Sequence, residues 1–361
     1  MSRRMLALMI LALAAPGAAQ EAQGVSDYRV LFAVCRAPRF ETPLVVLRTF
    51  TRRDQRLALA VDPESLATRV LPADDLKLDQ LSWDRVREVT RETPYGQAMA
   101  DSEQSATAEQ DAGIVHALTP GNGVVLTIDL CPSARPLDRR LFTTLILDFA
   151  PAEKPVPVGI AITGRWMIEH PKDLAWLRQR EREGEIAVTW INHSFNHRYD
   201  ERLPLSQNFL LESGTDPDLE VLATEKAMID QGLLPSVFFR FPGLVSDPKL
   251  VGRIVAYGLI PVGSDAWLAK NQVPSAGSIV LVHGNGNEPV GVDRLLALVK
   301  QERRAIREKS WLLSDLPKSV SRAERSHAWT VARTVRERAG KRWSPTTSSK
   351  RAGIGSRMGH G

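Results

Sequence analysis

The 361-residue chain has little cysteine and, after its first residues, no long apolar run. Cys35 and Cys131 permit one disulfide bridge at most. A membrane-spanning helix needs about 20 apolar residues, and nothing beyond the N-terminal segment approaches that length. These absences exclude an integral membrane protein after removal of the first segment.

Most of the chain also has no large excess of acidic or basic residues. The net charge of +5 would suit a nucleic-acid partner. However, residues 316–361 hold eleven Lys and Arg against Glu324 and Glu337, which leaves residues 1–315 with a net charge of −4. We therefore expect no nucleic-acid partner. We predict a basic, disordered tail over 316–361, which either touches anionic envelope polymer or has no function.

The first 19 residues have the pattern of a secretory signal peptide. Arg3 and Arg4 precede an apolar run over residues 5–15, and small residues follow at 17–19. The cleavage region has no cysteine, which argues against a lipid anchor. We expect a periplasmic or secreted protein, in which Cys35 and Cys131 either form a bridge or remain buried thiols.

Two regions follow the predicted signal peptide. Residues 21–118 contain short β-type runs and turn signals, and we predict a small β-rich accessory region without chemistry. Residues 119–312 alternate apolar runs with helical stretches, which is typical of parallel βα units. The expected strands are buried on both faces and cover residues 124–128, 156–162, 185–191, 237–241, 259–262 and 278–282.

Polar residues gather at the carboxyl ends of these six runs. Ligands and catalytic groups of parallel βα folds lie at that edge of the sheet. A purely structural set of polar residues would be scattered over both ends. The residues at this edge include Asp129, Thr163, Arg165, His193, His197, Arg240, Asp265 and His283.

His193 and His197, with the nearby Asp129, suit a divalent transition metal such as zinc, with Co, Ni or Mn as alternatives. Such a metal lowers the pKa of a bound water to about 7 and polarises a carbonyl, which favours hydrolysis of an amide or ester. Hydrolysis also needs a base and an acid. We predict Asp129 as the base and His283 as the acid.

Two further residues complete the predicted catalytic set. Asp265 is a candidate partner that holds the His283 imidazole in one tautomer, and Arg240 is a candidate to orient Asp129 and keep it ionised. Each has a simpler explanation: Asp129 as a turn cap, Arg240 in a surface ion pair and His283 in a loop. Their occurrence together favours an active site.

Residues 120–300 resemble the polysaccharide deacetylase family, also called the NodB homology domain. The family's first motif, TFDDG followed by PS, corresponds here to TIDLCPS at 127–133, and its H-S/T-x-x-H motif is intact at 193–197. R-x-P is present at 240–242, an Asp near a Trp at 265–267, and L-x-H at 281–283. The order of the five motifs is that of the family.

The resemblance implies a distorted (β/α) barrel that removes acetyl groups from polysaccharides such as peptidoglycan or chitin-like oligomers. It also implies that the backbone N–H of Gly243 contributes to an oxyanion hole and that Leu281 lines the acetyl pocket. Trp166 and Trp267 are candidate walls for a sugar ring, with a core position as the alternative. N-linked and O-linked acetyl groups both remain open.

One position departs from the family. Leu130 replaces the Asp that binds the metal in relatives. Either Asp129 itself binds the metal, or Asp138 substitutes, or two histidines and water hold it weakly; Asp138 is also expected as a helix N-cap. Cys131 is a further candidate ligand if it is not bridged. The alternative function is a catalytically impaired glycan-binding protein that keeps the barrel.

Overall fold

The computed structural model describes residues 24–36, 40, 42–106 and 109–321. The predicted signal peptide, and all of the predicted tail after Ser321, lie outside the described residues. Within the described ranges, no helix has the length and apolar character needed to cross a membrane.

The N-terminal part is a five-stranded antiparallel sheet in the order β4-β3-β2-β1-β5. Arg53 and Asp54, both with positive φ, form the two-residue turn between β2 and β3, as the right-handed strand twist of a hairpin requires. Two helices, α1 (Trp83–Thr90) and α2 (Pro94–Gln104), follow the sheet. The strands are β1 (Ser26–Cys35), β2 (Leu44–Arg52), β3 (Gln55–Val61), β4 (Thr68–Pro72) and β5 (Leu78–Gln80).

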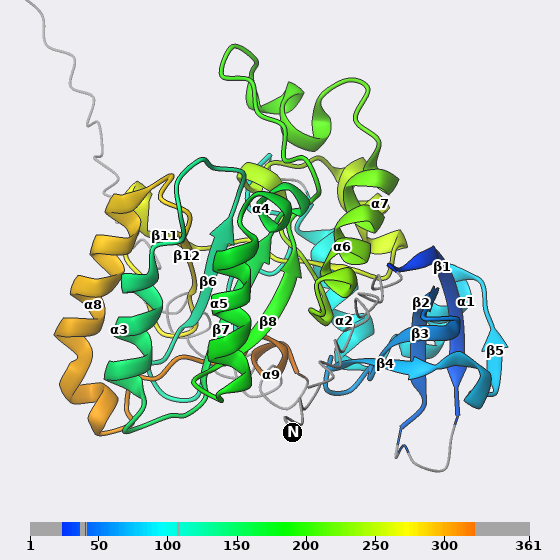
Figure 1. The fold of residues 1–361 in the computed structure, drawn as a ribbon, viewed down its shortest axis with the longest axis horizontal. Coiled ribbons are helices and arrows are strands. Elements are labelled where there is room, and N and C mark those ends of the chain that lie inside the picture. Colours follow the sequence, from blue (N-terminus) through cyan, green and yellow to red (C-terminus); the bar gives the residue numbers. More distant parts are fainter. Residues whose placement is uncertain (1–23, 37–39, 41, 107–108, 322–361) are drawn as a thin grey trace, which may run out of the picture.

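The larger part contains a seven-stranded parallel sheet in the order β10-β9-β8-β7-β6-β12-β11. Its strands are buried on both faces, which explains their continuous apolar runs. The arrowheads of β6, β7 and β8 point to one edge, and the segment between β8 and α6 projects beyond it (Figure 1). The strands are β6 (Val125–Leu130), β7 (Val156–Ile162), β8 (Ile186–Asn192), β9 (Pro235–Phe239), β10 (Ile260–Pro261), β11 (Ala266–Trp267) and β12 (Ile279–His283).

The two end strands of this sheet belong to one bent stretch of chain. β10 pairs with β9 and β11 pairs with β12, yet only residues 262–265 separate them. The stretch 260–267 therefore joins the two edges of the sheet and closes it into a distorted barrel. This confirms the predicted fold class, including the β-rich accessory region.

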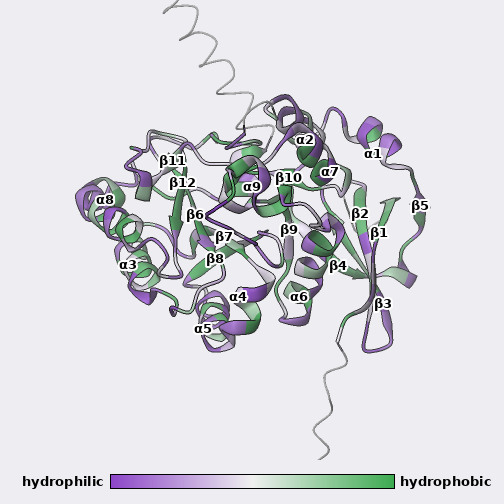
Figure 2. Cartoon of the chain, turned by 90° about the horizontal axis from the view of Figure 1, so that it is seen from above, coloured by the Kyte–Doolittle hydropathy of each residue, from purple (hydrophilic) through white to green (hydrophobic). Residues whose placement is uncertain are grey.

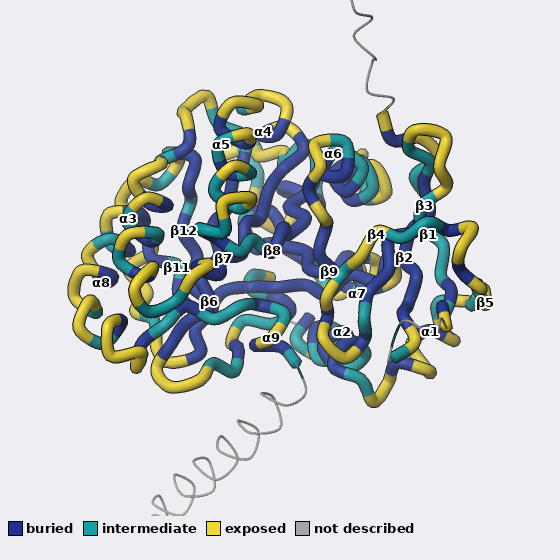
Figure 3. Tube along the Cα trace, turned by 60° about the horizontal axis from the view of Figure 1, so that its bottom comes forward, coloured by how far each residue is buried: buried dark blue, intermediate teal, exposed yellow. Residues whose placement is uncertain are grey.

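Helices cover the outside of the barrel. They bury their apolar sides against the strands and expose their polar sides, as the hydropathy and burial colours show (Figures 2 and 3). The last of them buries Leu316 and Val320 and carries the fold five residues into the predicted tail. The helices are α3 (Arg139–Phe149), α4 (Gly164–Glu169), α5 (Pro171–Arg182), α6 (Thr224–Asp230), α7 (Pro248–Ala256), α8 (Pro289–Arg307) and α9 (Leu316–Val320).

The accessory sheet shares a core with the barrel. Leu47 and Tyr95 belong to the same apolar cluster as Phe238 of β9. Arg48 is fully buried at the contact and forms an ion pair with Glu225 of α6, at 2.7 Å. The two parts therefore make one packed body.

Candidate active site

The site lies where β6, β8, β9 and β12 end. Side chains alternate along a strand, so Thr127 and Asp129 of β6 face the barrel interior, while Leu130 packs in the apolar layer with Leu141 of α3. Leu130 therefore points away from the site. The side chain of the next residue, Cys131, points to the interior again.

Cys131 joins the two predicted histidines. One donor atom from each of Cys131, His193 and His197 lies within 4.8 Å of the other two, and Cys131 Sγ is 3.5 Å from His193 Nε2. His197 Nε2 is buried and has no hydrogen-bond partner in the described part of the chain. One thiol and two imidazoles are a donor set that suits zinc. These residues therefore fit the metal that the resemblance implies.

The structure shows where the other candidate ligands lie. Asp129 is not a member of the three-donor cluster. Asp138 accepts a hydrogen bond from Arg140 N at the start of α3 and also pairs with the Arg140 guanidinium. Asp138 is therefore the helix N-cap that we expected as its alternative role, and it is not a substitute for the missing metal ligand. Cys131 forms no bridge with Cys35, so its thiol is available.

The protonation of the cluster suits metal binding. His193 Nδ1 lies 2.8 Å from the carbonyl oxygen of Arg240; because a carbonyl only accepts, Nδ1 carries the proton and Nε2 is left as a ligand. Burial lowers the pKa of His193 to about 4, so the ring is neutral at pH 7. Burial raises the pKa of Cys131, but the interactions of the thiol with His197 and His283 outweigh burial and lower that pKa to about 7.

A buried carboxylate holds the loop between the two histidines. Glu220 accepts hydrogen bonds from the backbone N–H groups of Phe195 and Asn196, each at 2.8 Å, and from the Asn196 side-chain amide at 2.7 Å. Ser194 and His197 are in the left-handed region (φ 67° and 49°), which is costly for residues other than glycine. Glu220 stabilises this loop conformation.

Sequence reasoning missed Glu220. The residue lies in a π-helical turn, Leu219–Ala223, just before α6. Such turns are frequent at functional sites, but neither the turn nor the approach to the loop can be read from sequence spacing.

An aromatic ring supports His197 from the other side. The Phe209 ring lies 5.3 Å from that of His197. A Cβ on Gly243 would come within 2.4 Å of the Phe209 ring, and Gly243 also has a positive φ of 61°. Glycine is therefore required here for packing and backbone conformation. The predicted oxyanion role of its N–H remains a proposal.

Asp129 and Arg240 lie together, as expected. Their closest atoms, Asp129 Oδ1 and Arg240 Nη1, are 3.6 Å apart, and Asp129 Oδ2 is 3.6 Å from His193 Nε2. Arg240 is fully buried and donates to Thr127 Oγ1 at 3.0 Å. Asp129 Oδ1 accepts no hydrogen bond from any described residue. This buried oxygen is available to a water or a substrate group.

The prediction that Asp265 partners His283 is wrong. Asp265 Oδ2 pairs with His116 Nδ1 at 2.6 Å, and Oδ1 accepts from Ile279 N at 2.9 Å. Ala266 is in register with Val280, which places Asp265 level with the start of β12. His283 is four residues further along the strand, roughly 13 Å at 3.3 Å per residue. Glu288, which the sequence reasoning missed, approaches His283 Nδ1 to 2.8 Å.

Of the residues predicted to bind substrate, some lie at the site and one lies in the core. Leu281 is in register with Thr127 and His283 with Asp129, so both face the interior. Trp267 is partly exposed, and its Nε1 donates to Glu288 Oε2 at 2.8 Å. Trp166 is fully buried in the outer apolar layer. The prediction that it forms a wall for a sugar is therefore wrong, and Trp166 occupies the core position that was the alternative.

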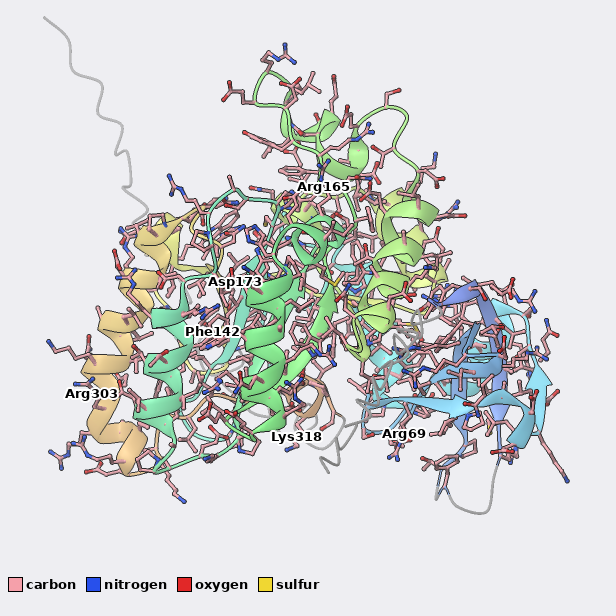
Figure 4. All side chains as sticks on the ribbon, in the orientation of Figure 1. Arg69, Phe142, Arg165, Asp173, Arg303 and Lys318 are labelled. Atoms are coloured by element: carbon pink, nitrogen blue, oxygen red, sulfur yellow. The ribbon has the colours of Figure 1, made fainter. Side chains whose placement is uncertain are left out.

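A cavity of about 760 Å³ is lined in part by His197 of the three-donor cluster. Its lining also includes Pro132 and the exposed Tyr199, whose ring stacks on that of Phe209 at 5.2 Å. Arg165, labelled in Figure 4, also belongs to the lining and lies near the projecting segment. The cavity is open and polar, with charges of both signs around it.

Comparisons with known proteins give distant likenesses. No family model matches the chain. A family 4 carbohydrate esterase from Streptomyces lividans, solved with acetate, is 19% identical over 55% of this chain and 96% of its own, with a TM-score of 0.39. A family 4 carbohydrate esterase from Bacillus anthracis is 17% identical over 61% and 90%, with a TM-score of 0.41. A family 4 pseudoenzyme from Bacillus anthracis is 13% identical over 55% and 65%, with a TM-score of 0.39. Values this low say nothing about activity.

Proposed function

We propose that the protein is an exported, metal-dependent hydrolase that removes acetyl groups from an acetylated cell-envelope polysaccharide such as peptidoglycan. The observation that supports this most is the Cys131, His193 and His197 cluster, with Asp129 and His283 beside it at one edge of the barrel. The order of the five sequence motifs points to the same chemistry.

Cys131, His193 and His197 would hold the metal. Zinc is the ion that one thiolate and two imidazoles suit best, and three protein ligands leave a position open for water or substrate. When bound, the ion polarises the acetyl carbonyl and makes a water acidic near neutral pH.

The chain's own residues handle the protons. Asp129 accepts the proton of the attacking water, and the buried Arg240 guanidinium, 3.6 Å from the Asp129 carboxylate, holds that carboxylate in place. A bond forms between the water oxygen and the acetyl carbon, and the carbon–nitrogen bond breaks as His283 gives its proton to the leaving nitrogen. The products are acetate and a free amino sugar; an O-acetyl substrate would yield an alcohol instead.

The cavity beside the ligands would receive the polysaccharide. The exposed face of Tyr199 suits stacking against a sugar ring. Trp267 and Leu281 would contact the sugar and its acetyl group nearer the metal, and Gly243 N–H would bind the developing oxyanion. Export of the protein would bring it to this substrate.

Metal analysis and acetate release test the proposal together. The purified protein should contain about one zinc or similar ion per chain and release acetate from peptidoglycan or acetylated chitooligosaccharides, and a chelator should abolish release. His193→Ala should lose the metal, and Asp129→Asn should keep it but lose turnover. A well-folded protein that binds these glycans without metal or turnover would favour the glycan-binding alternative and refute our proposal.

A further inference from the structure

Glu288 lies directly before α8, at the position where a side chain usually caps a helix. Its carboxylate makes no capping hydrogen bond. Glu288 Oε2 instead lies 2.8 Å from His283 Nδ1 and accepts a hydrogen bond of 2.8 Å from Trp267 Nε1. Glutamate is not among the side chains that usually cap a helix, and the Glu288 carboxylate is instead directed toward His283 and Trp267.

The environment favours an ionised Glu288. Burial raises the pKa of this carboxyl, but His283, Trp267 and Lys270 together outweigh burial and lower it below its ordinary value. Lys270 Nζ also lies 3.7 Å above the Trp267 ring, which holds the ring that donates to Glu288. Trp267 and Lys270 therefore help to fix the carboxylate in place.

Other carboxylates near His283 are committed elsewhere. Asp265 is engaged by His116 and by the backbone of β12, well below His283 along the strand. Asp129 lies between Arg240 and His193. Among the described residues, Glu288 is the carboxylate paired with His283 Nδ1.

We propose that Glu288 is the positioning residue for His283: it fixes the imidazole ring, keeps the proton on Nδ1 and directs Nε2 toward the metal cluster. This inference rests on the proposed hydrolase function. In the free protein the two groups form an ion pair, and Nδ1 is not aligned for a linear hydrogen bond. Such contacts often tighten only when substrate binds. Trp267 thereby acts through Glu288 as well as contacting substrate.

Steady-state kinetics of acetate release from an acetylated chitooligosaccharide test the proposal. Glu288→Gln keeps the size of the side chain and removes its charge. We expect kcat to fall about 10- to 100-fold, the range for loss of an orienting partner, with KM changed less than about twofold and zinc content unchanged. Asp265→Asn, the matched control, should keep kcat within about threefold and lower Tm. Equal kcat for Glu288→Gln and wild type, or equal losses for both variants, would overturn the proposal.

A spectroscopic measurement separates this inference from the proposed function. If wild-type protein releases no acetate, the proposed function fails, and ¹⁵N NMR of the histidine side chains decides the role of Glu288. The His283 Nδ1 resonance, assigned by its loss in His283→Gln, should show a protonated nitrogen in wild type and shift in Glu288→Gln but not in Asp265→Asn. An unchanged His283 resonance in Glu288→Gln would refute the inference.

Discussion

Replacing Glu220 by Gln should weaken metal binding without unfolding the protein. Glu220 Oε2 accepts two backbone N–H groups and Oε1 accepts the Asn196 amide. Glutamine offers one oxygen and one NH₂ group, so either orientation places an N–H donor against another donor. An unsatisfied buried donor costs about 1–3 kcal/mol. That cost falls on the loop that presents His197, whose left-handed residues already cost of order 1–3 kcal/mol each.

The cost should appear in the affinity for metal. We expect the zinc Kd of Glu220→Gln to rise about 10- to 100-fold, which is about 1.4–2.8 kcal/mol. Competition with a chromophoric chelator measures it. The matched control is Glu201→Gln, which makes the same charge change at an exposed position lining the cavity and should change Kd less than twofold. A Glu220→Gln protein with wild-type affinity, or equal weakening in both variants, would refute the idea that Glu220 holds the His193–His197 loop in its metal-binding conformation.

Two further predictions concern the fold, the first before the start of β7 and the second beside the site. Burial raises the pKa of Glu153 to about 7, so its ionisation destabilises the folded state as pH rises from the unfolded pKa near 4.5 through 7. Glu153→Gln should therefore raise the free energy of unfolding by about 1–2 kcal/mol at pH 8, a value reduced from roughly 3 kcal/mol because the side chain is partly exposed. At pH 4 the substitution should have almost no effect. Urea unfolding in which the effect of the substitution does not depend on pH would contradict this. Gly243→Ala should displace Phe209 and weaken zinc binding at least tenfold in the same chelator assay; a variant with wild-type affinity would show that Phe209 does not support His197.

The fold followed from sequence because strand ends and helical periodicity are local patterns. The runs ending at Asp129, His193 and Arg240 predicted the edge where these side chains meet. Cys131 was one of several candidates, since the direction of Leu130 depends on the register of β6. Trp166 remained ambiguous because a large aromatic residue near a strand end suits either a pocket or a core.

The partners of site residues were harder to predict. Asp265 and Trp267 belong to the motif that precedes the one with His283, but the order of motifs does not say how far along neighbouring strands their residues lie. The bent stretch that closes the barrel places Asp265 at the start of β12. Glu288 and Glu220 reach the site from loops and a π-helical turn, whose paths depend on the packing of the whole barrel.

Cobalt substitution tests the central claim, which is that Cys131 binds the metal in place of the Asp that Leu130 replaces. Cobalt-loaded wild-type protein should show a near-ultraviolet charge-transfer band from thiolate to metal. In Cys131→Ser, this band should be absent and the zinc Kd should rise at least about tenfold. A cobalt-loaded wild type without the band, or a Cys131→Ser protein with the same spectrum and affinity as wild type, would contradict the account.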